Sequence, residues 1–270
     1  MKILILTTKS HIYANYVIKE LARRRAFSDN EVIIFEQDWV IPYKNKLIGL
    51  MKYLKLSGFR YTIAQIMKQY SFILAQSIAY LNKKIDSYYY PYSKVDNRIK
   101  NEIVMDLRKE ETFKHIKSSS PDVIISIFSR EIIPAEIFRL PRFGCINIHP
   151  SLLPMFKGIS PTFWYLAKGE KMAGISLHYV VEKIDKGGII AQAEVSTEGL
   201  KTEHALYQKC TKKAVEMVDD FLSKLAKGEE VSSVSQEEFK SYFSIPKKKY
   251  VKIFRERGYS FFKFNEFIDF

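Results

Sequence analysis

Residues 122–154 read DVIISIFSREIIPAEIFRLPRFGCINIHPSLLP, and this stretch carries the clearest structural pattern in the chain. Residues 122–127 form an isoleucine-rich run, which is typical of a strand buried on both faces of a parallel sheet. Residues 135–140 predict a short helix, and residues 144–148 predict the next strand. Residues 128–134 would then lie just past the carboxyl end of a strand, where open α/β sheets bind ligands.

The start of the chain shows the same alternation of strand and helix. Residues 2–7 and 31–35 predict strands, and residues 14–25 between them predict a helix, so a βαβ unit with parallel strands is indicated. We therefore expect an α/β, Rossmann-like fold with a mostly parallel, twisted sheet flanked by helices. The other predicted elements are a helical stretch over 47–90, a helix over 97–117, a strand over 189–195, a long amphipathic helix over 202–227 and a short helix near 247–257.

At 270 residues the chain is long enough for one large domain with an appendage. Residues 1–200 are expected to form a catalytic domain that carries a helical, basic insertion at about 41–100. Residues 201–270 are expected to add a C-terminal helix and a short appendage.

The composition excludes several classes of protein. Apolar residues make up 47% of the chain and charged residues 27%, and no run reaches the roughly 18 consecutive apolar residues of a membrane-spanning helix. The first strand is too short for the core of a signal peptide, so we expect a cytoplasmic protein. The two cysteines, Cys145 and Cys210, are not spaced for a zinc site or a disulfide framework, and we expect both to be buried hydrophobic residues.

The net charge of +13 is concentrated in one region. Residues 41–100 hold eleven Lys or Arg against two Asp, together with nine of the seventeen tyrosines. Three alternatives fit this pattern: an insertion packed on the sheet with its lysines in water, a surface for a phosphorylated substrate, or a contact with a membrane surface or nucleic acid. The tyrosines within 88–92 would either stack on a base or sugar, or pack in the core.

The turn after the first strand, residues 7–11, lacks the glycines of a dinucleotide-binding loop. Lys9 and Ser10 are still placed to meet an anion at the N-terminus of the following helix, which makes Lys9 a candidate substrate-binding residue. The alternative is a loop that is simply solvated.

Asn147 and His149 are two residues apart on a predicted strand, so their side chains leave the same face. The asparagine amide can donate a hydrogen bond to an oxygen that gains negative charge, and the histidine can move a proton near neutral pH. Asp185 precedes Gly187 and Gly188, where a turn can present a carboxylate that orients an imidazole. Taken alone, these residues also fit a hydrogen-bonded core histidine beside a turn-forming asparagine.

The whole block, however, resembles the formyltransferase family that uses 10-formyltetrahydrofolate. The matching motifs are INIHPSLLP at 146–154, KG at 157–158, GISLH at 174–178 and IDKGGIIAQ at 184–192. The resemblance implies the formyltransferase fold, the formyl donor 10-formyltetrahydrofolate, no metal, and a catalytic set of Asn147, His149 and Asp185.

The same resemblance implies that two loops hold the pterin, largely through backbone groups. The cofactor-binding candidates on these loops are Phe128, Arg130, Glu131, Ile132, Ile133, Val181, Glu182 and Ile184. His178 is also a family position and a candidate substrate-binding residue. Its alternative role is that of a strand histidine in a polar pocket.

The implied reaction is acyl transfer to a primary amine. Asn147 and protonated His149 would stabilise the oxyanion, and His149 would carry a proton from the amine to the departing nitrogen. Asp185 would keep His149 basic and hold a water that assists the transfer.

Departures from the family narrow the amine acceptor. The turn at 7–11 lacks the glycine-bearing phosphate loop of the glycinamide ribonucleotide enzymes, and the residues after 227 do not predict the C-terminal barrel of the methionyl-tRNA enzymes. We therefore expect a small-molecule partner, the amino group of a nucleotide-linked amino sugar, with the insertion facing its diphosphate or pairing two subunits in a homodimer.

Other functions stay open at the level of the sequence. They are a methionyl-tRNA or other small-amine formyltransferase, a 10-formyltetrahydrofolate hydrolase, and a non-enzymatic scaffold that binds folate or a membrane surface. Nucleic acid is not an expected partner, because a basic surface alone is poor evidence for it.

Overall fold

The structure is a computed structural model that describes residues 1–37, 46–96, 98–104, 106–239 and 241–268. Parts of the predicted insertion, residues 41–45 and 97, lie outside the described residues.

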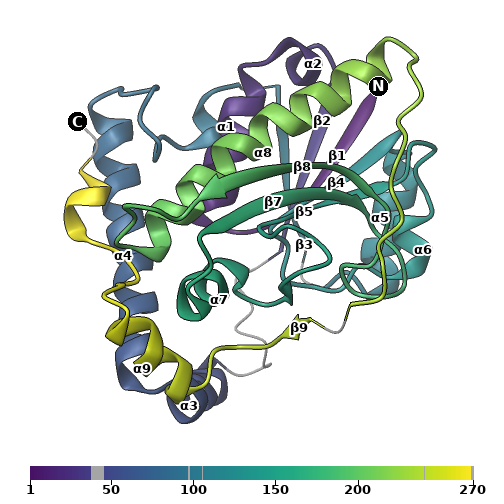
Figure 1. Cartoon of the computed structure of the whole chain (residues 1–270). Helices are drawn as coiled ribbons and strands as arrows, with labels where there is room; N and C mark the ends of the chain where they lie inside the picture. The colour runs from purple at the N-terminus through teal and green to yellow at the C-terminus, as the bar shows by residue number, and fades with distance from the viewer. Residues whose placement is uncertain (38–45, 97, 105, 240, 269–270) are drawn as a thin grey trace.

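A seven-stranded sheet forms the centre of the molecule, with the strand order β3-β2-β1-β4-β5-β7-β8 (Figure 1). Its strands are β1 (Lys2–Thr8), β2 (Glu31–Gln37), β3 (Lys100–Val104), β4 (Val123–Ile127), β5 (Cys145–His149), β7 (Met172–Tyr179) and β8 (Ile189–Ser196). Neighbouring strands from β3 to β5 are parallel, whereas β7 is antiparallel to β5, and β8 to β7. The predicted α/β fold with a mostly parallel sheet is confirmed.

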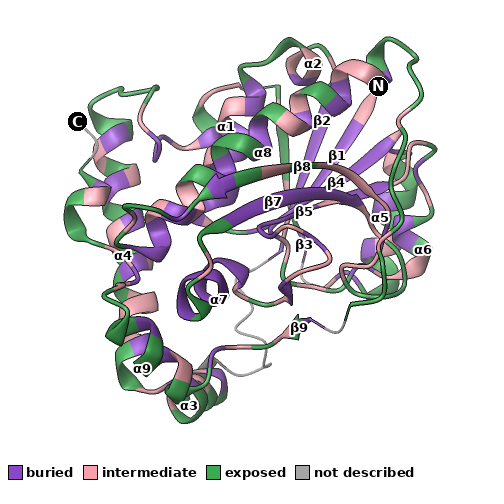
Figure 2. Cartoon of the chain, viewed as in Figure 1, coloured by how far each residue is buried: buried purple, intermediate pink, exposed green. Residues whose placement is uncertain are grey.

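Helices cover both faces of this sheet, and their outward sides are exposed while the central strands β1, β2, β4, β5 and β7 are largely buried (Figure 2). The edge strands β3 and β8 are more exposed. The helices are α1 (Ile12–Ala22), α2 (Arg25–Ser28), α3 (Lys46–Ser57), α4 (Phe59–Leu81), α5 (Glu110–Ser119), α6 (Ala135–Phe138), α7 (Pro161–Lys168), α8 (Glu203–Ala226) and α9 (Lys248–Glu256), with the 3-10 turns η1 (Tyr92–Lys94) and η2 (Phe264–Phe267). None of the helices in the described part of the chain has the length and hydropathy needed to span a bilayer.

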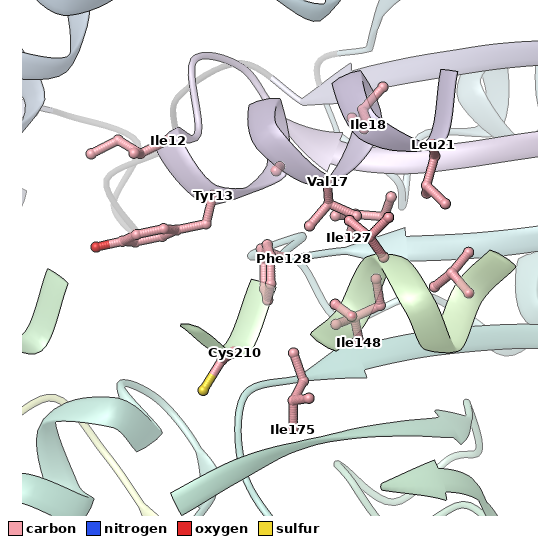
Figure 3. Close-up of a cluster of buried hydrophobic side chains, with 14 of the residues drawn as sticks. Ile12, Tyr13, Val17, Ile18, Leu21, Ile127, Phe128, Ile148, Ile175 and Cys210 are labelled. Carbon is pink, nitrogen blue, oxygen red and sulfur yellow. The ribbon is translucent and has the colours of Figure 1, made fainter. Parts of the chain in front are cut away.

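Successive residues of the central strands enter different cores. In β1, Ile3 and Ile5 belong to the core that includes α1 and α8, whereas Leu4 and Leu6 belong to the core that includes α5 and α6. Figure 3 shows the first of these cores, in which side chains of α1 lie above the isoleucines of the sheet. The strands read as continuous apolar runs because both of their faces are covered.

The helix predicted over 97–117 is wrong in its first half. Residues 100–104 form β3, which pairs in parallel with β2, and α5 begins only at Glu110. An edge strand carries charged and polar residues, and here they imitate the polar side of an amphipathic helix. Ile103, which fits the apolar side of such a helix, is exposed on this strand.

The helical stretch predicted over 47–90 is confirmed as α3 and α4, which are separated by Gly58, but it is wrong after Leu81. Lys83 has a left-handed backbone with a φ of +53°, which ends the helix, and residues 82–90 form turns and bends. Gly58 has a φ of +88°, a left-handed conformation that interrupts a helix and favours glycine. Tyr88, Tyr89 and Tyr90 are buried after α4, so these three tyrosines of the aromatic cluster pack in the interior.

The chain returns to the sheet after α8 as an extended segment (Figure 1). Within it β9 (Tyr242–Phe243) pairs in parallel with β6 (Lys157–Gly158), a short strand that follows the motif at 146–154. The C-terminal segment is therefore in direct contact with the block that the sequence singles out.

Candidate active site

The end of β5 carries Asn147 and His149, and β7 lies antiparallel beside it. This register places His178 of β7 directly opposite Asn147. Asp185 lies on the connection between β7 and β8, and its Oδ1 is 3.7 Å from His149 Nδ1 and 3.7 Å from His178 Nε2. The structure therefore brings Asn147, His149 and Asp185 together, with His178 as a fourth member.

The hydrogen bonds of His149 define which ring nitrogen can take a proton. Its Nε2 lies 3.0 Å from the Phe156 carbonyl oxygen, which can only accept, so Nε2 carries a hydrogen and donates. In the neutral ring Nδ1 then has a free lone pair that faces Asp185. The side chain is 5% exposed, so water has little access to it.

His178 is held in the opposite way. Its Nδ1 donates to the Tyr179 carbonyl oxygen at 2.8 Å, and its Nε2 accepts from Asn147 Nδ2 at 3.2 Å, which requires the neutral ring. Burial lowers the pKa of His178 to about 4; Asp185 opposes this shift, and His149 adds to it. With 2% of its surface exposed, His178 lies behind Asn147 and fixes the orientation of the amide.

Asp185 is held by a backbone hydrogen bond and by a tight turn. Its Oδ2 accepts from the Gly158 N–H at 2.8 Å, while its own backbone has a φ of +51°, a conformation that non-glycine residues adopt at a cost. A Cβ on Gly187 would clash with the Tyr179 carbonyl, so the turn after Asp185 requires glycine there.

Several groups in this site could not be read from the sequence motifs. The Phe156 carbonyl and the Gly158 N–H hold the histidine and the carboxylate, and both come from the segment that pairs with β9. Gln236, on the C-terminal segment, donates from Nε2 to the Asp185 carbonyl at 3.0 Å and to the Gly187 carbonyl at 2.8 Å. In the sequence, Gly158 belongs to the matching KG motif, whereas no motif includes Gln236.

Two buried polar atoms near the site have no hydrogen-bond partner among the described residues. They are Lys157 Nζ and Gln236 Oε1. Lys157 is 4% exposed, and burial lowers its pKa; Lys186 lowers it further, while Asp185 opposes the shift. Such atoms are costly unless a water or a ligand completes their hydrogen bonds.

The predicted cofactor residues after β4 lie in varied environments. Phe128 is buried and stacks on His11 with ring centroids 5.3 Å apart, and Glu131 accepts from the Leu107 N–H at 2.9 Å. Burial raises the pKa of Glu131. Arg130 is exposed, and Ile133 is buried in the core of α5 and α6.

Three of the predicted cofactor residues present apolar side chains to solvent. Ile132 is 70% exposed, and Val181 and Ile184 on the second loop are also exposed. Glu182 pairs with Arg139 at the end of α6, the helix that follows the first loop, so this ion pair connects the two loops. Exposed apolar side chains on two connected loops suit a flat, partly apolar ligand.

Lys9 lies apart from this constellation. It is exposed in the turn between β1 and α1, and it lines a cavity of about 250 Å³ together with Ser10 and His11. Within the described residues, no group of His, Cys, Asp and Glu side chains is arranged to hold a metal ion.

A model of the formyl transferase family matches residues 92–221, from just before β3 to most of α8. The match includes Asn147, His149, His178 and Asp185, whereas Gln236 lies outside it. Residues 92–221 belong to the formyl transferase family. The resemblance seen in the motifs is thereby confirmed.

Relatives and solved structures agree with this membership. The chain is 31% identical over 140 residues to methionyl-tRNA formyltransferase of Bacillus cytotoxicus, which covers 52% of this chain and 44% of that protein. It is 33% identical over 129 residues to the bifunctional polymyxin resistance protein ArnA of Wigglesworthia glossinidia brevipalpis, which covers 48% of this chain and 20% of that protein. The matched part is thus less than half of either relative.

Two solved structures share the fold. One is a 4-N formyltransferase from Francisella tularensis, with a TM-score of 0.57 and 18% identity over 90% of this chain and 76% of that one. The other is HypX from Aquifex aeolicus in complex with tetrahydrofolic acid, with a TM-score of 0.53 and 18% identity over 90% of this chain and 29% of that one.

Proposed function

We propose that this protein transfers a formyl group from 10-formyltetrahydrofolate to the primary amine of a nucleotide-linked amino sugar. The observation that carries the proposal is the position of Asp185 Oδ1, 3.7 Å from both histidines, beside the amide of Asn147 within a formyl transferase domain.

The two predicted pterin loops fit the donor. Their exposed Ile132, Val181 and Ile184 offer apolar contacts, and the buried Lys157 Nζ and Gln236 Oε1 offer unused polar atoms near Asp185. Bound there, the folate would supply the activated formyl group that is transferred to the amine acceptor. The solved HypX structure with tetrahydrofolic acid shares this fold, which supports folate as the donor class.

Asn147 has one amide hydrogen engaged by His178, and its second remains for the formyl oxygen. That oxygen gains negative charge as the amine attacks the formyl carbon. A preorganised donor at this position typically accounts for roughly 100- to 1000-fold in rate. His178, neutral and buried, acts as a positioning residue because it fixes which way the amide points.

His149 is placed to move the proton that the reaction releases. The attacking amine loses one proton as the new C–N bond forms, and the departing folate nitrogen gains one as the old bond breaks. Because Nε2 is committed to the Phe156 carbonyl, Nδ1 is the ring nitrogen that takes and returns this proton. Asp185 stabilises the charged ring, and its 3.7 Å separation is of the kind that shortens when substrates bind.

Two amine acceptors have support from the relatives of this chain. The 4-N formyltransferase shares the fold over most of its length, whereas the 31% identical relative acts, by its name, on methionyl-tRNA. That sequence match makes methionyl-tRNA the second candidate acceptor. The basic insertion fits both acceptors, because charge attracts phosphates of either kind without regard to sequence.

A direct assay separates these acceptors. The purified chain would be incubated with 10-formyltetrahydrofolate and, in turn, dTDP-, UDP- and GDP-linked 4-amino sugars and methionyl-tRNA. Release of tetrahydrofolate would be followed by absorbance and the formylated product by mass spectrometry. We expect turnover with at least one nucleotide-linked sugar. Turnover with methionyl-tRNA alone would replace the acceptor, and formate release that is independent of any amine would indicate a hydrolase.

A further inference from the structure

The cavity that Lys9 lines is at the carboxyl end of β1 and β2, away from the catalytic residues. It has a volume of about 250 Å³ and is walled by the turn after β1, by α4, by residues 91–93 and by the edge strand β3. We call it the β1–α4 cavity. The side chains that matter for its chemistry are Lys9, Glu36, Gln76, Tyr92, Ser93 and Asn101.

The register of the sheet gives the distance from this cavity to the catalytic strand. Glu36 of β2 is level with Thr7 of β1, which is level with Ile127 of β4 and, through it, with Ile148 of β5. Three strand spacings of about 4.8 Å separate β2 from β5, so Glu36, on the far wall of the cavity, lies about 14 Å from the strand that carries Asn147 and His149. A molecule that reaches both places must be longer than a single sugar ring.

The insertion contributes one wall of the cavity and holds it in place through amide groups. Gln69 of α4 donates from Nε2 to the Ser10 carbonyl at 2.9 Å, and Gln76 donates from Nε2 to Asn15 Oδ1 at 3.1 Å. Asn15 Oδ1 also accepts from the Tyr92 N–H at 3.2 Å. These bonds fix α4 and Tyr92 against α1, so the wall is held in place by the protein itself.

The polar atoms inside the cavity suit an uncharged ring with hydroxyl and amide groups. Glu36 Oε1 accepts from the Tyr92 hydroxyl at 2.6 Å, which leaves its second oxygen to accept from a ligand. Gln76 keeps its Oε1 as an acceptor, and Asn101 keeps its amide hydrogens as donors. A phosphate in the interior would be repelled by the Glu36 carboxylate.

The charges are arranged along the cavity. Lys9 is exposed at the turn, and among the described lining residues it is the single Lys or Arg; the basic residues of the insertion that the structure describes do not line the cavity. His11 adds no charge, because its Nδ1 accepts from the Ala14 N–H and burial lowers its pKa. His11 also stacks on Phe128 of the first predicted cofactor loop, which connects the cavity to the catalytic side.

We propose that the β1–α4 cavity binds the nucleoside end of the acceptor, with Glu36, Gln76 and Asn101 receiving its base and ribose and Lys9 meeting the attached phosphate. The assignment rests on the proposed function for the identity of the acceptor. A volume of about 250 Å³ is just below the roughly 300 Å³ at which sites for whole drug-sized ligands begin, so it suits one part of a nucleotide sugar. The 14 Å separation leaves room for the diphosphate between the nucleoside and the sugar amine.

The test closes the cavity without touching the catalytic residues. Asn101→Trp fills the cavity from the edge strand, and Lys100→Trp, on the same strand but on its opposite face, is the matched control. Binding of UDP, dTDP and GDP would be measured by isothermal titration calorimetry in the absence of folate, with pyrophosphate and uridine as the separate halves of the ligand.

We expect at least one nucleoside diphosphate to bind the unmodified chain and the Lys100→Trp variant equally, and to bind Asn101→Trp at least about tenfold more weakly. Lys9→Ala is expected to weaken the diphosphate but not uridine. Equal binding by Asn101→Trp, no binding of any nucleotide, or binding of pyrophosphate as tight as that of the nucleotide would overturn the assignment.

The proposed function and the cavity can fail separately. Nucleotide binding that Asn101→Trp abolishes, without formyl transfer to any amine, would keep the cavity and remove the proposed function. Formyl transfer to a nucleotide-linked sugar with the same KM in Asn101→Trp as in the unmodified chain would keep the function and remove the cavity.

Discussion

Replacing Gln236 tests whether the C-terminal segment takes part in catalysis. The Gln236 amide holds the carbonyls of Asp185 and Gly187 at 3.0 and 2.8 Å, and Asp185 itself has a left-handed backbone with a φ of +51°. Such a backbone costs roughly 1 to 2 kcal/mol, and two hydrogen bonds contribute about 1 to 3 kcal/mol together. The two effects are comparable, so Gln236→Leu should let the turn relax and carry the carboxylate away from His149.

The expected result is a loss of kcat of roughly 10- to 100-fold, since a displacement of about 1 Å at a reacting group can cost about 100-fold. KM for the amine should change little, because Gln236 contacts the turn that carries Asp185. Gln236→Glu should be at least as damaging, because it replaces the donor with a carboxylate that faces two carbonyl oxygens.

The assay is steady-state formyl transfer together with urea unfolding. Ser235→Ala is the matched control, since Ser235 is the exposed neighbour of Gln236. A Gln236→Leu variant with unchanged kcat, or one whose loss of activity is matched by Ser235→Ala, would refute the view that this side chain positions Asp185.

Three further outcomes are expected. Gly158→Ala should lower the free energy of unfolding by about 1 to 3 kcal/mol in urea, because Gly158 has a φ of +95° and a Cβ would clash with the Phe243 carbonyl; no change would contradict this packing of β9 on β6. His178 has a pKa of about 4 in the folded chain and about 6.5 when unfolded, so the unfolded chain binds more protons between these values and stability falls as the pH is lowered from about 6.5 to 4, by up to roughly 3 kcal/mol. His178→Gln should reduce that slope, as measured by urea unfolding across this pH range, and an unchanged slope would show that another group is responsible. Lys157→Met should leave the thermal midpoint unchanged or raise it, because it removes a buried cation without a hydrogen-bond partner among the described residues, and a large decrease would show that Lys157 has a stabilising role.

The fold could be predicted largely from local patterns. The isoleucine-rich runs indicated buried parallel strands because helices cover both faces of the sheet. The edge strand β3 could not be predicted in the same way, because its exposed polar residues follow the spacing of an amphipathic helix. Pairing with β2, a contact distant in sequence, determines its conformation.

The candidate site was predictable to a different degree for each residue. The two-residue period placed Asn147 and His149 on one face of a strand. The glycines after Asp185 indicated an exposed carboxylate, but its pairing with His149 came from the family resemblance. The Phe156 carbonyl and the Gly158 N–H are backbone groups that any sequence carries, and Gln236 contacts Asp185 across 51 residues of chain. No local pattern encodes such contacts. A surface for a phosphorylated substrate was one of three alternatives for the insertion's lysines. In the structure the insertion lines the β1–α4 cavity with Gln76 and with the ring of Tyr92.

The most direct test of the central claim is single-turnover transfer of a ¹³C-labelled formyl group from 10-formyltetrahydrofolate to a nucleotide-linked 4-amino sugar, compared among the unmodified chain, Asn147→Ala, His149→Ala and the surface control His115→Gln. We expect a labelled formamide with the unmodified chain and with His115→Gln. Asn147→Ala and His149→Ala should lower the rate by roughly 100- to 1000-fold. Both variants should unfold at the same urea concentration as the unmodified chain. Full activity in either Asn147→Ala or His149→Ala would contradict the account.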